Sequence, residues 1–262
     1  MKSKTLSLFL IILILHACTA PPLRKTLKID HPPKIGIIGF KVTAPISSLS
    51  SIVQSPPKGI SKEEEKELIN KRLRDIEEKA DSFLIKDLIE KGKAVPVKIP
   101  EGLFGTKRGE KPELEALENL RKEFGLDAVL YGEIPWYGKT RLIYPILGIS
   151  LDIIGESVII GSVTNWNETI ISANIGFELL TSVPLWFGGA YFFGVAFRPV
   201  TVDAHVVSTS EGTEIWHKSV DRIVSRRILI KYPESERAKK EVQLDASLLI
   251  AISAIAESLS ME

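Results

Sequence analysis

Few residues in this chain of 262 can carry redox or soft-metal chemistry, because it has one cysteine, two methionines and four histidines. A single thiol cannot form an intramolecular disulfide, and it cannot build a cysteine-rich zinc site. An excess of charge of either sign is also lacking, since 34 basic residues balance 33 acidic residues. Nucleic-acid binding depends on basic charge, so no nucleic acid is predicted as a partner.

Recognisable catalytic motifs are missing as well. The glycine clusters lack the Lys-Ser/Thr ending of a P-loop and the dinucleotide-binding fingerprint, and no Gly-x-Ser-x-Gly elbow occurs. Asp127 and Glu133 flank one predicted strand about 20 Å apart, which is too far for a carboxylate pair. The sequence therefore predicts no catalytic residues, no cofactor and no enzyme activity. An envelope hydrolase is the third function considered, and the sequence contains no set of catalytic residues for it.

The histidines outside the N-terminal segment are His31, His205 and His217. The last two are predicted on adjacent strands of one hairpin. Two histidines could begin a zinc site, but no cysteine remains for it and no carboxylate stands at a telling spacing. We therefore interpret them as solvent-facing strand residues and predict no metal site.

The first twenty residues have the layout of an export signal. Lys2 and Lys4 precede a nearly unbroken apolar run, residues 6–15, which is about half of what a membrane-spanning helix needs. The segment Leu15-His16-Ala17-Cys18 resembles a bacterial lipobox, which implies a diacylglyceryl group and palmitate on Cys18. An ordinary secretory signal is the alternative. Thr19 after the cysteine would favour the outer membrane, with the domain facing the periplasm.

The chain is predicted to consist of a signal peptide, which is removed, followed by a tether and one domain. Residues 1–17 form the signal peptide, and residues 18–33 form a proline-rich tether. Removing the signal takes away two lysines and leaves 32 basic and 33 acidic residues. Residues 34–259 form one domain, interrupted by an apolar insertion at about 136–198.

The domain begins with alternating strands and helices. An apolar run at 34–40 predicts a strand buried on both faces. Ser61 and Glu64 form a capping box before a long helix that ends before Gly92. A short strand at 94–99 follows, assigned to a sheet edge because it contains a proline. A further helix, closed by glycine, and a further strand are predicted in the segments 112–125 and 126–134.

The C-terminal part completes the predicted fold. Residues 200–207 and 215–224 form a hairpin, and an apolar stripe at 248–259 marks a final helix. The fold class is therefore α/β (α+β), with a mixed sheet of about five strands and helices packed on it. Trp216, Trp136 and Tyr131 are candidate contact residues, although Trp216 fits the core better.

Three local patterns resemble a known family. They are Lys-Ile-Gly-Ile-Ile-Gly-Phe at 34–40, Leu-Asp-Ala-Val-Leu-Tyr-Gly-Glu at 126–133 and Glu-Gly-Thr-Glu-Ile-Trp at 211–216. Together they resemble the α/β domain of the N-terminal part of TolB, of the curli-secretion lipoprotein and of the penicillin-binding-protein activator lipoproteins. The resemblance covers roughly residues 34–135 and 199–259, and it implies a binding or assembly domain without catalytic residues.

The insertion departs from this family because it is longer and more apolar. Two apolar runs, 142–160 and 183–197, flank a segment at 171–179 in which apolar and polar residues alternate. The alternation predicts a β-hairpin near 157–180, either inserted into a membrane or folded onto its own domain. The aromatic residues that would contact a membrane or a partner are Trp186, Phe187, Tyr191, Phe192, Phe193 and Phe197.

Location is the most definite functional prediction of the sequence. We expect a lipid-anchored, non-enzymatic envelope protein that works by protein–protein contact in assembly, secretion or cell-wall maintenance. The alternative is a homo-oligomeric export pore that inserts the β-hairpin into the outer membrane. Under either hypothesis, the predicted partners of the protein are the membrane, through the lipid, and other envelope proteins.

Overall fold

The computed structural model describes residues 32–138, 143–188, 191–192, 195–196 and 198–259. Side chains are described for these residues apart from 143–145 and those after 183 and before 198. Cys18, the predicted signal peptide and nearly all of the predicted tether lie outside the described residues.

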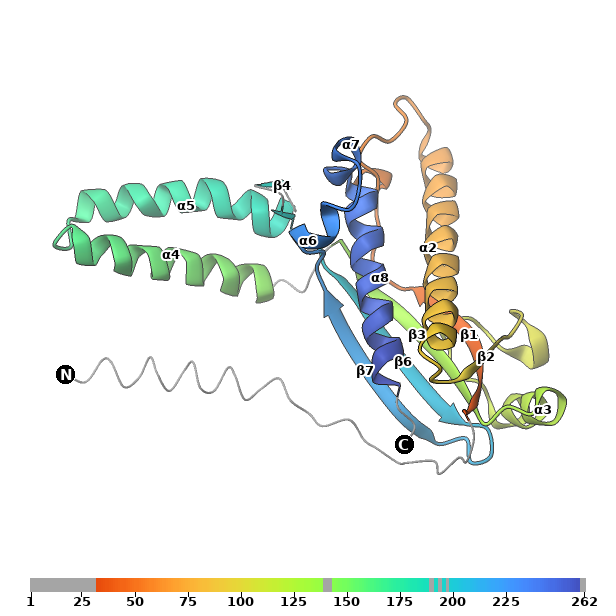
Figure 1. The fold of residues 1–262 in the computed structure, drawn as a ribbon. Helices are drawn as coiled ribbons and strands as arrows, with labels where there is room; N and C mark the ends of the chain where they lie inside the picture. The colour runs from red at the N-terminus through yellow and green to blue at the C-terminus, as the bar shows by residue number, and fades with distance from the viewer. Residues whose placement is uncertain (1–31, 139–142, 189–190, 193–194, 197, 260–262) are drawn as a thin grey trace, which may run out of the picture.

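A mixed five-stranded sheet forms the centre of the domain (Figure 1), in the order β2-β1-β3-β6-β7. The first three strands are parallel to one another, whereas β6 runs antiparallel to both β3 and β7. The strands are β1 (Lys34–Val42), β2 (Val95–Lys98), β3 (Ala128–Tyr137), β6 (Val200–Ser208) and β7 (Glu214–Arg222). The predicted fold class is confirmed.

Two long helices cover one face of this sheet, as Figure 1 shows: α2 (Lys62–Glu90) and α8 (Lys240–Ser258). Their apolar stripes and the inner face of the strands form the main core. Helix α3 (Leu114–Phe124) packs on the opposite face. The shorter helices are η1 (Leu49–Ser51), η2 (Leu103–Gly105), α6 (Arg226–Leu229) and α7 (Glu234–Arg237).

Local signals in the sequence are found where they were expected. The Ser61 hydroxyl accepts a hydrogen bond from the Glu64 amide, and the Glu64 carboxylate accepts one from the Ser61 amide, so the capping box is formed. Helix α3 ends at Gly125, which has a φ of 63°. Strand β2 lies at the sheet edge, and Trp216 lies in the core.

A buried ion pair ties β1 to α2. Asp81, on α2, is 1% exposed and accepts a hydrogen bond from the Phe40 amide at 3.0 Å and from Arg108 Nη1 at 2.6 Å. The register of β1 shifts beside Gly39, where φ is 105°, and a Cβ there would lie 2.7 Å from the Asp81 carboxylate. Burial raises the pKa of Asp81, against the opposing effect of Arg108 and the Phe40 amide.

The insertion between β3 and β6 is helical, so the prediction of a β-hairpin near 157–180 was wrong. Helices α4 (Ile143–Val163) and α5 (Glu168–Gly188) run antiparallel and project away from the sheet (Figure 1). A two-stranded ribbon follows, with β4 (Tyr191–Phe192) and β5 (Val195–Ala196). The alternation at 171–179 misled because its spacing of four residues fits a helix as well as a strand.

Candidate functional site

The tip of the hairpin has a defined structure. Helix α4 ends at a turn in which Asn165 and Trp166 have φ values of 52° and 60°. The Trp166 amide donates to the Gly161 carbonyl at 2.7 Å, and a Cβ at Gly161 would lie 2.6 Å from the indole ring. Asn167 then caps α5, because its Oδ1 accepts hydrogen bonds from the amides of Thr169 and Ile170.

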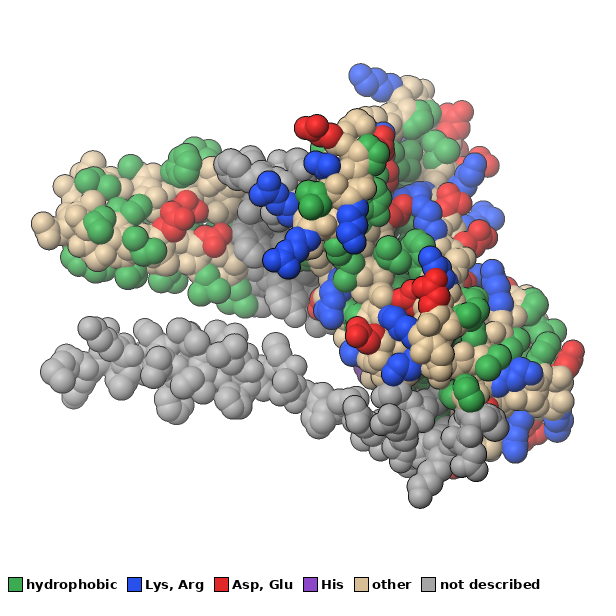
Figure 2. Space-filling view, viewed as in Figure 1, with side chains coloured by type: hydrophobic (Ala, Val, Ile, Leu, Met, Phe, Trp, Pro, Cys, Tyr) green, Lys and Arg blue, Asp and Glu red, His purple; other side chains and the backbone are tan. Residues whose placement is uncertain are grey.

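The outer surface of the hairpin is apolar. Figure 2 shows hydrophobic side chains along both α4 and α5, interspersed with uncharged surface and interrupted by one acidic patch. Large apolar side chains that a soluble domain would normally bury are exposed along both helices. They include Ile146, Leu147, Leu151, Ile154, Val158, Ile159, Val163, Ile170, Phe177, Leu179, Leu180 and Val183.

Polar side chains meet between the two helices instead. Glu178 and Ser182 are 7% and 6% exposed. The Ser182 hydroxyl lies 3.0 Å from Glu178 Oε2 and 3.3 Å from Asp152 Oδ2, so it bridges α5 and α4. A polar seam under an apolar surface is the reverse of the pattern in a water-soluble helical hairpin.

The dimensions of the hairpin match those of a bilayer. Each helix has 21 residues and is therefore about 31 Å long, close to the hydrocarbon thickness of about 30 Å. Among the described residues, one helix segment, Ile146–Val163, passes the length and hydropathy test for a membrane span, with a mean hydropathy of 1.8 and 11% of it buried. Trp166 at the tip is 60% exposed, a position that suits a membrane–water interface.

Four of the six aromatic residues singled out in the sequence lie at the base of the hairpin. Trp186 and Phe187 belong to the last turn of α5, and Tyr191 and Phe192 form β4. Their side chains are not described, and Phe193 and Phe197 lie outside the described residues. None of the six predicted contact residues lies on α4, although the apolar composition of 142–160 carried that signal.

A basic cluster lies at the end of the sheet where the hairpin is attached. Strand β3 ends at Tyr137 and β6 begins at Val200, and Val200 pairs with Arg222 at the end of β7. From there the chain continues into α6. The exposed side chains of this cluster are two isoleucines and four cations: Arg222, Ile223, Arg226, Arg227, Ile230 and Lys231.

None of these four cations forms an ion pair with another described residue; the only side-chain hydrogen bond among them is from Arg222 to the Asp221 carbonyl. Unpaired cations beside exposed isoleucines suit an anionic apolar–water interface.

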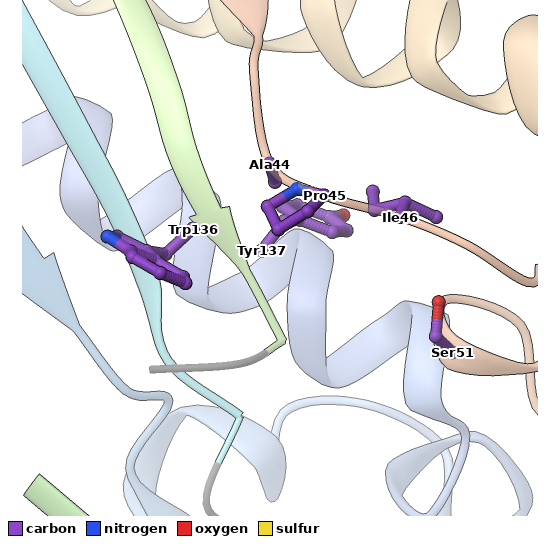
Figure 3. Close-up of a pocket in the computed structure, with 6 residues that line it drawn as sticks. All are labelled: Ala44, Pro45, Ile46, Ser51, Trp136 and Tyr137. Atoms are coloured by element: carbon purple, nitrogen blue, oxygen red, sulfur yellow. The ribbon is translucent and has the colours of Figure 1, made fainter. Parts of the chain in front are cut away.

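A pocket near the other side of the hairpin base is small. Figure 3 shows its lining, in which Tyr137 of β3 lies beside Pro45 of the loop after β1 and Trp136 points the other way. The pocket encloses about 240 Å³ including open solvent, less than the roughly 300 Å³ at which ligand sites usually begin. The Tyr137 hydroxyl donates to Asp245 Oδ1 at 3.0 Å. These contacts indicate a structural role for Tyr137. Its burial raises the pKa of the hydroxyl well above the ordinary value.

The sheet face that α2 and α8 leave uncovered carries an aromatic row. Tyr131, His205 and His217 are register neighbours on β3, β6 and β7. The ring of His205 stacks on Tyr131 at 5.1 Å and on His217 at 4.3 Å between centroids. Burial raises the pKa of Tyr131, with Glu214 and Glu133 adding to it. The predicted placement of both histidines on adjacent strands is confirmed.

Glu214 is the residue that the sequence missed in this row. His205 Nδ1 lies 2.8 Å from Glu214 Oε2, although nine positions separate the two residues. The irregular register between Val206 and Val207 brings Glu214 into this position. The sequence showed no carboxylate at a telling spacing from the histidines, and the structure places Glu214 beside one of them.

Comparisons with known proteins give structural neighbours only. No protein-family model and no curated protein sequence matches this chain. The PelC dodecamer from Paraburkholderia phytofirmans aligns with a TM-score of 0.41 and 12% identity, over 92% of this chain and 96% of that chain. A point variant of that dodecamer aligns with a TM-score of 0.39 and 10% identity, over 90% of this chain and 96% of that chain.

The lipoprotein GNA1162 from Neisseria meningitidis aligns with a TM-score of 0.29 and 14% identity, over 72% of this chain and 79% of that chain. Similarity of this degree assigns neither a family nor a function. The resemblance to TolB-like domains therefore stays a prediction from the sequence.

Proposed function

We propose that this protein is a non-enzymatic, lipid-anchored envelope protein that inserts the α4–α5 hairpin into the membrane carrying its lipid. The α/β domain is then held at the membrane surface and acts by contact with other envelope proteins. The observation that carries the proposal is the inverted hairpin, which has an apolar outer surface over a seam containing Asp152, Glu178 and Ser182. In hydrocarbon this arrangement is favourable, because the apolar side chains meet lipid while Ser182 hydrogen-bonds Glu178 and Asp152 between the helices.

The hairpin and the lipid anchor would act together. The lipid on Cys18 would tether the N-terminus, and the hairpin would attach the domain to the same membrane at a second point. With the outer membrane as the predicted destination, the domain would face the periplasm. The pore hypothesis required a β-hairpin in the insertion, where the structure has helices α4 and α5 instead. Outside the central sheet, the described residues contain no strand pair long enough to cross a membrane. A homo-oligomer remains compatible with the proposal, with the acidic patch of the hairpin turned away from lipid.

Removing the lipid alone tests the proposal. We expect the Cys18→Ala protein to stay in the membrane fraction and to resist extraction with alkaline carbonate, because the hairpin remains inserted. Fractionation on a sucrose gradient would also identify the membrane. A Cys18→Ala protein found entirely in the soluble fraction would contradict insertion, and it would leave the lipid as the sole attachment.

The basic cluster should strengthen attachment to anionic lipid. In the Cys18→Ala background, Arg226→Gln with Arg227→Gln is expected to lower binding to vesicles containing phosphatidylglycerol by roughly 30-fold, at about 1 kcal/mol for each cation. Binding to phosphatidylcholine vesicles should not change. Flotation of vesicles measures both.

A matched control neutralises two lysines outside the basic cluster, one in the loop after η2 and one on α3. Lys107 and Lys122 are 72% and 74% exposed, and replacing both with glutamine removes the same charge. If this control loses as much binding as the arginine variant, the effect comes from net charge alone and the cluster has no special position.

A further inference from the structure

We propose that His205, Glu214 and His217 form a zinc-binding site on the uncovered face of the sheet. This site is independent of membrane insertion and would serve the α/β domain whatever its place in the envelope. One donor atom from each of the three side chains lies within 4.8 Å of the other two. Two imidazoles and one carboxylate are a donor set that binds Zn²⁺, with a fourth position left for water or a partner.

The backbone holds the two histidines in place. His205 and His217 are directly opposite each other on β6 and β7, within a ladder of eight register pairs. Strands hold their side chains more precisely than loops do, so little ordering is lost when a metal binds. His205 is 27% exposed and Glu214 is 41% exposed at the side chain, so an ion can reach the site from solvent.

The present contacts can be exchanged for metal bonds with small movements. A hydrogen bond, with its proton on one of the two atoms, joins His205 Nδ1 and Glu214 Oε2 at 2.8 Å. Two ligands of one zinc ion at about 2.1 Å each are roughly 3.4 Å apart in a tetrahedral site, so Zn²⁺ can replace that proton. The His217 ring is stacked on His205 with 15° between the planes and needs only to rotate about its side-chain bonds.

The surroundings favour a cation. Asp203 precedes His205 by two positions on β6, so it lies on the same face of the strand. Its Oδ1 is buried and has no hydrogen-bond partner among the described residues. Glu133 on β3 pairs with Asp203 in the register. These carboxylates add negative potential beside the site, which lowers the cost of placing a divalent ion there.

The test is a titration of the mature protein in detergent, without a histidine tag and after treatment with a chelator. Calorimetry with zinc chloride is expected to give one zinc per chain for the native protein. His205→Ala and His217→Ala should each weaken binding at least tenfold, since even supporting residues of metal sites have effects of 10- to 100-fold. Glu214→Gln should weaken it as well. Cobalt absorption spectra would report three protein ligands and a tetrahedral geometry.

His31→Ala is the matched control, because His31 is the remaining histidine after the predicted signal peptide. It should leave zinc binding unchanged. Circular dichroism separates loss of binding from loss of fold, and the three site residues contribute nothing to the main core. The site would be overturned if the native protein did not bind zinc stoichiometrically, or if the His205 and His217 variants bound zinc as tightly as the native protein. Neither result would affect the proposed membrane function.

Discussion

A lysine in the middle of each hairpin helix, introduced as Ile154→Lys with Phe177→Lys, is expected to release the Cys18→Ala protein from the membrane. Both positions are near the centre of their helices, and both side chains are more than 60% exposed, at 61% and 62%, so neither change removes a core contact. A lysine at the bilayer centre costs about 3 kcal/mol on insertion scales. Two of them cost about 6 kcal/mol, or roughly four orders of magnitude in partitioning.

Depth provides the control for this experiment. Val163 ends α4 and is 76% exposed, so Val163→Lys adds charge to an equally open apolar position near the tip. A lysine there reaches the headgroup region and should leave the protein in the membrane pellet. Membrane retention of the Ile154 and Phe177 double variant would place the hairpin outside the hydrocarbon, where it would pack against protein instead.

The second large effect is expected from Arg108→Met, which should lower the free energy of unfolding by about 3–5 kcal/mol. The substitution leaves the 1% exposed Asp81 carboxylate without the guanidinium that lies 2.6 Å away, and it also removes the weaker pairing with Glu77 at 3.9 Å. The Phe40 amide alone then faces a buried charge. Urea unfolding of the Cys18→Ala protein in detergent, followed by tryptophan fluorescence, measures the change.

The loss in Arg108→Met should depend on pH. Burial already raises the pKa of Asp81, and removing Arg108 removes the main effect that opposes this. A carboxyl group with a raised pKa in the folded state binds a proton that the unfolded chain has released. Stability is therefore fully present below the ordinary aspartate pKa and is lost as pH rises, so the deficit should shrink towards pH 4 and grow towards pH 7.

Lys107→Met is the control for the same loop, because Lys107 is 72% exposed and, among the described residues, pairs with Glu110 alone. It should change stability by less than about 0.5 kcal/mol. A deficit in Arg108→Met that is no larger than this, or that does not vary with pH, would mean that Asp81 tolerates burial without its partner.

Much of the domain could be predicted from local patterns. The capping box at Ser61 and Glu64, the glycine that ends α3 at 125 and the alternating strand of β6 act through contacts close in sequence. Period and length also separated the strands from the long helices. The short helices α6 and α7 carried no such signal, because four residues are too few for a period.

The insertion shows where periodicity fails. Ile171, Ile175 and Leu179 are four residues apart, and four is both two strand repeats and close to one helical turn. The residue that favours a helix is Asn167, which caps α5. Which side chains face outwards could not be read from the sequence, because both helices are apolar on most sides and the seam exists only once the two are paired.

By itself, then, the sequence determined the fold class, the main helices and strands, and the placement of His205 and His217 on adjacent strands, since each depends on local periodicity and capping. Only the tertiary structure decided the other features. The buried pair of Asp81 and Arg108, the outward apolar surface of the hairpin and the approach of Glu214 to His205 all join residues through packing or strand register. Such contacts depend on how elements are positioned in space, and a one-dimensional pattern does not contain that position.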